Sequence, residues 1–256
     1  DTLAVLRYFN QQKGKTLGII NSAESSIARE SNNAIETHAG PEIGVASTKA
    51  FTTQLVALGA LTLFMSNFNK SMGKNEINKL SNALVEVPGY ISKILKMDDI
   101  FHKTATSIKN AKNVLYIGRG TNYPVALEGA LKLKEISYIH AEGYPAGEIK
   151  HGPIALVEKG VPVIVIAPSD HLIDKTISNV EEVLSRGAKV IFLSDKKGIK
   201  KINNKKITTI CLPGTHEIIS PILYSIPVQL IAYHTAVLKG TDVDQPRNLA
   251  KSVTVE

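Results

Sequence analysis

The sequence predicts an α/β fold of two doubly wound parallel-sheet domains in tandem, the first truncated at its N-terminal side, followed by a C-terminal tail. Strands and helices alternate along the chain, which is typical of a parallel sheet covered by helices. A pattern also occurs twice: Gly40-x-Glu42-Ile43 followed by Gln54-Leu55-x-Ala57, and His216-Glu217-Ile218 followed by Gln229-Leu230-x-Ala232. Each copy leads into a long apolar helix, so the chain contains two copies of one unit. The second copy begins with a strand, a glycine turn and a helix that the first copy lacks.

The first copy is predicted to contain, in order, a strand at 17–21, a short helix at 25–31, a strand at 33–38 and a long apolar helix at 47–68. Two helices at 75–97 and 98–111 then bridge to the second copy, and Pro88-Gly89 is expected to kink or split the first of them. We place the domain bounds at 1–72, 73–240 and 241–256. Because the chain opens at Asp1 inside a helical pattern, we expect that start to be a cut.

The second copy is predicted to contain strands at 114–117, 161–167, 190–194 and 207–212, with later helices at 171–186 and 220–238. Gly118-Arg119-Gly120 ends the first of these strands, and Thr121 or Asn122 can cap a helix with Pro124 in its first turn. This glycine turn fits either a phosphate cradle or a tight turn between strand and helix. A GxG pattern without a third glycine is weak evidence for the cradle.

Composition and charge narrow the class of protein. The net charge of +7 would suit nucleic acid or an anionic small molecule as a partner. The lysines between 196 and 206 lie in a polar stretch without an aromatic residue for base stacking, so we expect a solvated loop and no nucleic-acid partner. Cys211 lies in an apolar run and is predicted to be a buried strand residue. The apolar helix candidate at 55–65 is too short to cross a bilayer and no signal segment opens the chain, so we expect a soluble, cytoplasmic protein without a membrane partner.

A charged stripe follows the glycine turn. Glu128, Lys132 and Glu135 are spaced i, i+4 and i+7 and therefore share one face of the predicted helix. Leu127, Ala130 and Leu131 recur at core spacing on another face. Taken alone, the stripe fits a solvated face whose Glu–Lys pair stabilises the helix by roughly 0.2–0.5 kcal/mol. The segment is otherwise mostly apolar, so we favour a stripe that lines a cleft, where a carboxylate beside an ammonium can move protons.

Four strings resemble the isomerase half of the glutamine:fructose-6-phosphate aminotransferases (isomerising), also called glucosamine-6-phosphate synthases: GVASTKAFTTQL at 44–55, ALEGALKLKEISYIHAE at 126–142, GEIKHGP at 147–153 and GTDVDQPRNLAKSVTVE at 240–256. The resemblance covers essentially the whole chain and implies a pair of sugar isomerase (SIS) domains. It implies a reaction that makes glucosamine 6-phosphate from fructose 6-phosphate and glutamine-derived ammonia, in amino-sugar biosynthesis. Ketose–aldose interconversion needs no metal or redox cofactor, and we expect none.

The resemblance implies a role for each of several residues. Glu135 would be the acid/base that moves the proton between C1 and C2, and Lys132 would stabilise the developing enediol charge. His151 would assist ring opening in the active site of the partner subunit, which implies a homodimer. Lys251 would form the imine with the open-chain ketose, and the tail that carries it is expected to close over the sugar site as a lid. The sugar site would be lined by Val45, Ser47 and Ala250.

Two departures from the family pattern bear on activity. The family's glutaminase domain, with its amino-terminal cysteine, and its Ser/Gln/Ser/Gly/Glu/Thr phosphate loop would both lie before Asp1, so we expect the fragment alone to be incomplete for activity. Two other functions compete with this hypothesis. A non-catalytic SIS module that binds a sugar phosphate would not need Lys132 and Glu135 together with Lys251 in an otherwise apolar tail. A simple phosphosugar isomerase would not be expected to carry the terminal string.

Overall fold

The computed structural model describes residues 1–251, and the chain divides into two compact units. Unit 1 comprises Asp1–Ile43 and Ser47–Ser81, and unit 2 comprises Gly44–Ala46 and the chain from Asn82 onward. The division falls inside one helix, α4 (Lys74–Leu95). The α/β class with parallel sheets is confirmed. The domain bounds 1–72, 73–240 and 241–256 stay a proposal.

Unit 1 holds a small parallel sheet and several helices. Its elements are α1 (Thr2–Gln11), β1 (Leu17–Ile20), α2 (Ser26–Glu30), β2 (Asn33–Glu36), α3 (Lys49–Phe68) and the first turns of α4. The strands β1 and β2 pair in parallel, with Leu17 opposite Asn33. The Ser25 hydroxyl accepts a hydrogen bond from the Ala28 amide (3.2 Å) and so caps α2. These elements agree with the predicted order of strand, helix, strand and long helix.

Within residues 1–251, two helices are apolar and long enough to cross a membrane by length and composition, α3 and α9 (Ser220–Lys239). The expectation that the longest apolar helix, at 55–65, is too short is therefore wrong, because α3 runs from Lys49 to Phe68 and has 20 residues. Most of the apolar window of α9 is buried inside the protein (67%), as is typical of a core helix. The corresponding window of α3 is only 11% buried.

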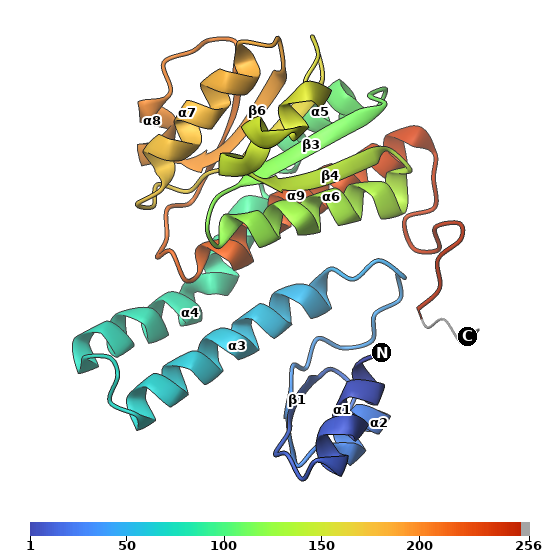
Figure 1. Cartoon of the computed structure of the whole chain (residues 1–256), viewed down its shortest axis with the longest axis vertical. Helices are drawn as coiled ribbons and strands as arrows, with labels where there is room; N and C mark the ends of the chain where they lie inside the picture. The colour runs from blue at the N-terminus through green and yellow to red at the C-terminus, as the bar shows by residue number, and fades with distance from the viewer. Residues whose placement is uncertain (252–256) are drawn as a thin grey trace. The chain divides into compact units, whose positions relative to one another are not determined.

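Unit 2 is built on a five-stranded parallel sheet in the order β4-β3-β5-β6-β7 (Figure 1). The strands are β3 (Asn113–Gly118), β4 (His140–Pro145), β5 (Pro162–Ile166), β6 (Lys189–Asp195) and β7 (Thr208–Leu212). The helices are α5 (Asp98–Ile108), α6 (Asn122–Ser137), α7 (Ile173–Leu184), α8 (Lys196–Lys201) and α9, with short 3-10 turns η1 (Ala146–His151) and η2 (Pro153–Leu156). Chain order reverses between β3 and β5, as in other doubly wound sheets.

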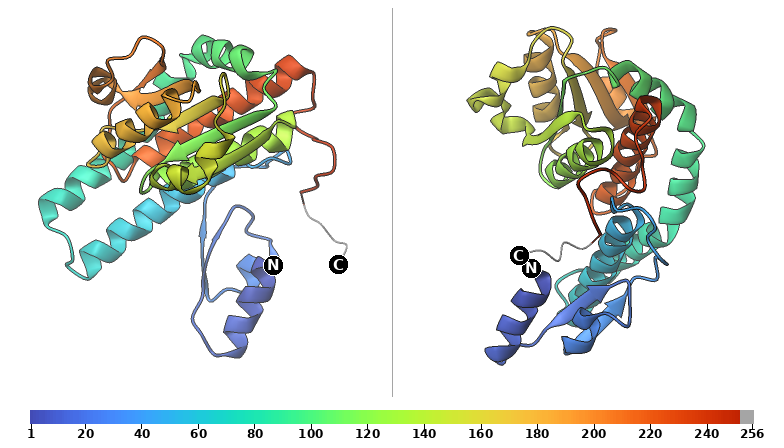
Figure 2. Two further views of the ribbon diagram at one scale, coloured as in Figure 1. Left: turned by 45° about the horizontal axis from the view of Figure 1, so that its top comes forward. Right: turned by 90° about the vertical axis from the view of Figure 1, so that its right-hand side faces the viewer.

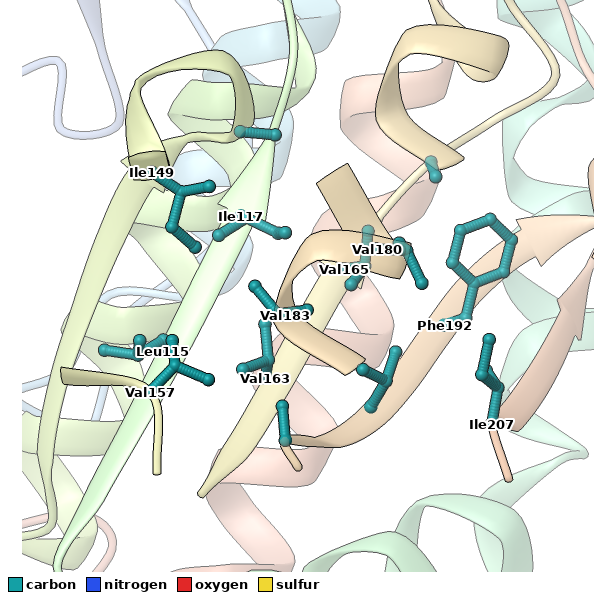
Figure 3. Packing of buried hydrophobic residues seen from close by; sticks show 14 of the residues in the cluster. Leu115, Ile117, Ile149, Val157, Val163, Val165, Val180, Val183, Phe192 and Ile207 are labelled. Carbon is teal, nitrogen blue, oxygen red and sulfur yellow. The ribbon is translucent and has the colours of Figure 1, made fainter. Parts of the chain in front are cut away.

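Helices cover both faces of this sheet. On one face α6 and α9 run side by side and contact each other extensively (Figure 1, Figure 2). On the other face, Val180 and Val183 of α7 pack over strand residues that include Val163, Val165 and Phe192 (Figure 3). Each of these side chains is fully buried, so α7 and this face of the sheet share one hydrophobic cluster.

Two glycines let α6 approach its neighbours closely. A Cβ atom at Gly118 would collide with the Asn122 backbone, so a side chain at that position would obstruct the turn from β3 into α6. At Gly129 an added Cβ would lie 2.6 Å from the Tyr116 ring and 2.9 Å from the Val228 side chain. The glycine turn therefore has a packing reason of its own, which supports a tight turn over a phosphate cradle.

Several sequence predictions differ from the structure. The strand β4 was not predicted, and the lysine-rich stretch expected to be a loop contains the short helix α8. The Asp195 carboxylate explains this helix, because it accepts hydrogen bonds from the Lys197 and Gly198 amides at 2.8 and 3.1 Å. Pro88 lies inside α4 without splitting it.

The prediction that Cys211 is buried is wrong. Its side chain is exposed on β7, whereas Ile210 and Leu212 on either side are buried. The reason is that β7 lies at the edge of the sheet and its alternate residues point away from the core.

Candidate active site

The charged stripe on α6 is buried. Lys132 is 3% exposed and Glu128 is 7% exposed, whereas Leu127 and Leu131 are each 42% exposed. The prediction of core positions is therefore wrong for these two leucines and confirmed for Ala130, which is 2% exposed. The face that carries the charges is the one that packs within unit 2, which argues against a solvated stripe. A cleft along this face stays a prediction.

Lys132 and Glu135 form a close ion pair. The Lys132 ammonium lies 2.6 Å from Oε2 of Glu135, and the Glu135 side chain keeps 20% of its surface exposed. Glu135 is thus the more accessible member of the pair, while Lys132 is enclosed. A carboxylate held in this way beside a fixed ammonium can accept a proton from a bound molecule, and the ammonium can stabilise negative charge that develops there.

Glu128 completes the stripe and was not among the predicted site residues. Its Oε1 accepts a hydrogen bond from Nε2 of Gln229 on α9 (3.2 Å). Burial raises the pKa of Glu128 above its ordinary value, and the Lys132 ammonium opposes that shift. The sequence signal for Glu128 was its spacing of four residues from Lys132. Its partner Gln229 lies 101 positions away, and no local pattern points to it.

We expect Glu128→Gln to remove a pH-dependent loss of stability. Because the native pKa of Glu128 is raised, its contribution to stability is fully present below the ordinary value of 4.5 and is lost as pH rises through the native value. Glutamine keeps the shape and does not titrate. Thermal unfolding of the natural full-length protein should be measured between pH 4 and 8. The midpoint temperature of the variant should rise relative to that of the wild type as pH increases. Glu181→Gln, at an exposed position of α7, is the matched control, and a Glu128→Gln difference that is constant with pH would contradict the assignment.

The tail of unit 2 runs past the end of α6. The Thr241 hydroxyl donates to the Ile136 carbonyl (2.6 Å). Farther along, the Val45 amide donates to the Asp244 carbonyl (2.8 Å), and the Lys251 ammonium donates to the Gly44 carbonyl (2.8 Å). The segment Gly44–Ala46 and the tail are thus joined at two points, which brings the predicted residues Val45 and Lys251 into one cluster.

The remaining predicted residues lie in different surroundings. Ala250 and Lys251 are both exposed, so the structure does not show Lys251 enclosed beside Lys132. Ser47 belongs to unit 1, where its hydroxyl donates to Oε1 of Glu42 (3.2 Å). The Glu42 carboxylate also accepts from the Thr48 and Ala50 amides at the start of α3.

His151 lies at the end of η1 with a 66% exposed side chain. Its Nδ1 is 2.8 Å from Oε2 of Glu148, so its ionic partner is a neighbour on the same turn. Gly152, which follows, has φ of 142°, a backbone conformation that glycine adopts readily. The histidine side chain is therefore exposed to solvent at the end of this turn.

Comparisons with known proteins agree with this fold. The family model described as "SIS domain" matches residues 1–64 and 107–239. The chain is 54% identical over its full 256 residues to the glutamine–fructose-6-phosphate aminotransferase (isomerizing) of Bartonella quintana, and 54% identical to that of Zymomonas mobilis. It spans 42% of the length of each of these curated relatives.

Solved structures give the same picture. The C-terminal domain of glucosamine-fructose-6-phosphate aminotransferase from Francisella tularensis superposes with a TM-score of 0.93 at 45% identity, covering 96% of this chain and 70% of that one. A glucosamine-6-phosphate deaminase from Thermotoga maritima superposes with a TM-score of 0.74 at 24% identity, covering 98% of this chain and 70% of that one. The second likeness concerns the fold alone.

Proposed function

The chain belongs to the SIS domain family, and from this premise we propose that it is the isomerase portion of a glutamine:fructose-6-phosphate aminotransferase (isomerising). The proposed reaction converts fructose 6-phosphate and ammonia to glucosamine 6-phosphate and water, in the cytoplasm. The observation that carries it is the 2.6 Å contact between buried Lys132 and partly exposed Glu135, in a chain that aligns over its whole length with these aminotransferases. A module that only binds sugar phosphate would have no need of such a proton-transfer pair.

Glu135 transfers the proton between C1 and C2. Its carboxylate takes the proton from C1 of the C2 imine, which leaves a double bond between C1 and C2. The same group then returns a proton to C2 while the C1 hydroxyl loses its own, so that an aldehyde forms at C1. The Lys132 ammonium, fixed at 2.6 Å, stabilises the negative charge that develops between these two steps.

Lys251 supplies the nucleophile that activates the ketose. Its amine adds to the C2 carbonyl and water leaves, which gives an imine; ammonia then displaces the lysine amine at C2. The exposed position of Lys251 and its hydrogen bond to Gly44 are consistent with a tail that moves onto the substrate. The sugar site would be lined by Val45, Ser47 and Ala250. Ammonia would come from a glutaminase domain elsewhere in the longer natural chain, as the coverage of 42% suggests.

His151 is proposed to assist ring opening in the site of a second subunit of a homodimer. The proposal draws support from the exposure of its side chain, which is 66%. A histidine is suited to protonating the ring oxygen near neutral pH.

Mixing two inactive variants tests this arrangement. His151→Ala and Glu135→Gln subunits of the natural full-length protein should each be inactive, because each lacks one group that both sites of its homodimer need. Random exchange at equal amounts makes half of the dimers mixed, and one of their two sites is intact, so about a quarter of wild-type activity should return. No recovery after subunit exchange has been verified by mass spectrometry would place His151 in its own chain's site.

The proposed function as a whole is tested by product formation. The natural full-length protein, supplied with fructose 6-phosphate and either glutamine or ammonium, should release glucosamine 6-phosphate, detected by mass spectrometry. Binding of fructose 6-phosphate without turnover from either nitrogen source would favour the non-catalytic sugar-phosphate module instead.

A further inference from the structure

The helix that carries the proton-transfer pair ends in an unusual residue. Tyr138, the C-cap of α6, has φ of 60° and ψ of 16°, in the left-handed region. Glycine or asparagine normally takes this position, because a bulky side chain there is strained. Strain of this kind persists only where the surrounding structure compensates for it.

The tyrosine side chain makes two contacts with one residue of the tail. Its hydroxyl accepts a hydrogen bond from the Arg247 amide (2.8 Å), and the Arg247 guanidinium lies over the ring at 4.2 Å from the centroid. Pro246, which precedes Arg247 in the tail, is buried, although the residues on either side of it are exposed. The tail therefore docks on the end of α6 at a defined point.

Both ends of this contact lie close in sequence to the proposed chemistry. Tyr138 follows Glu135 by three residues, and Arg247 precedes Lys251 by four. We propose that Tyr138 is a positioning residue that latches the tail to the end of α6 through Arg247, and so sets where Lys251 meets the substrate held beside Glu135. The role of Lys251 in this statement rests on the proposed function, whereas the docking itself does not.

Glycine at position 138 separates this role from a merely structural one. Tyr138→Gly relieves the left-handed strain and removes both contacts, so thermal stability should hold or rise while the latch is lost. Tyr138→Phe keeps the ring beneath Arg247 and removes only the hydroxyl acceptor. The matched control is Tyr90→Phe, which removes a tyrosine hydroxyl whose hydrogen bond goes to exposed Glu86 (2.9 Å) on α4.

Two readouts on the natural full-length protein test the proposal. Amide hydrogen exchange of the peptide covering 243–251 reports docking, and the yield of borohydride-trapped fructose 6-phosphate on Lys251 reports delivery of the amine. We expect exchange about three- to tenfold faster in Tyr138→Phe, from the loss of one hydrogen bond, and faster still in Tyr138→Gly. The adduct yield should fall in the same order, with Tyr90→Phe unchanged.

Unchanged exchange in Tyr138→Gly would overturn the latch, and so would normal adduct yield in that variant. If exchange rises in both Tyr138 variants while wild-type protein itself gives no adduct on Lys251, docking through Tyr138 stands and the proposed role of Lys251 fails.

Discussion

Replacing Glu135 with glutamine is expected to lower glucosamine 6-phosphate formation by about 10²- to 10⁴-fold, because glutamine keeps the shape of the side chain but cannot accept the C1 proton. The loss should appear in kcat with little change in KM, since the missing interaction belongs to the transition state. The fold should survive, because Lys132 keeps a second carboxylate, Glu128, on the same stripe. Steady-state kinetics of the natural full-length protein with fructose 6-phosphate measure both constants.

The same chemical change elsewhere serves as the control for Glu135. Glu181 is exposed on α7, so Glu181→Gln should leave kcat and KM unchanged. A Glu135→Gln enzyme that keeps more than about a tenth of wild-type kcat would place the base on another residue.

Replacing Lys251 with arginine is expected to abolish the covalent sugar adduct. Arginine keeps the positive charge and can still donate to the Gly44 carbonyl, but its guanidinium stays protonated and does not form the imine. Borohydride treatment of wild-type protein with fructose 6-phosphate, followed by peptide mass mapping, should show the adduct on the tail peptide. The variant should show none, and amination should fall with it.

Another exposed lysine controls for non-specific trapping. Lys239 ends α9 and is exposed, so Lys239→Arg should leave the adduct yield unchanged. An adduct that forms only on a lysine other than Lys251 would remove the imine role from the tail.

The parallel fold was predictable because its strands carry short-range signals. The strands β3, β5, β6 and β7 are apolar runs bounded by turn residues, and they were predicted to within two residues at each end. The missed strand β4 reads HAEGYP, which contains glycine and proline and no β-branched residue. Its pairing with β3 along the full length of both strands holds it extended, and that long-range contact has no local signature.

Periodicity located the site but did not decide which face of α6 is buried. The spacing placed Glu128, Lys132 and Glu135 on one face correctly, whereas the leucines assigned to the core proved exposed. The deciding contact comes from Gln229 on α9, whose Nε2 donates a hydrogen bond to the Glu128 carboxylate. A hydrogen bond from a polar side chain on a neighbouring helix lowers the free-energy cost of burying a charged stripe. The periodicity of one helix carries no information about side chains on another helix.

The tail was the least predictable part of the site. The composition of the tail suggested a segment that needs a docking partner, yet the partners are backbone groups and a tyrosine far away in sequence. The hydrogen bond from Lys251 to Gly44 spans 207 positions. The residues 252–256, which complete the terminal string, lie outside the described residues.

Hydrogen exchange at C1 of the substrate tests most directly whether the pair on α6 transfers the proton. Natural full-length protein incubated with fructose 6-phosphate in deuterated water should introduce deuterium at C1, which nuclear magnetic resonance detects. The reason is that deprotonation of C1 is reversible, so Glu135 can exchange its proton with solvent and return a deuteron to C1 instead of C2. Glu135→Gln protein that still binds the sugar phosphate should introduce deuterium no faster than a protein-free control. Deuterium incorporation by Glu135→Gln at the wild-type rate would contradict the role of the Lys132–Glu135 pair.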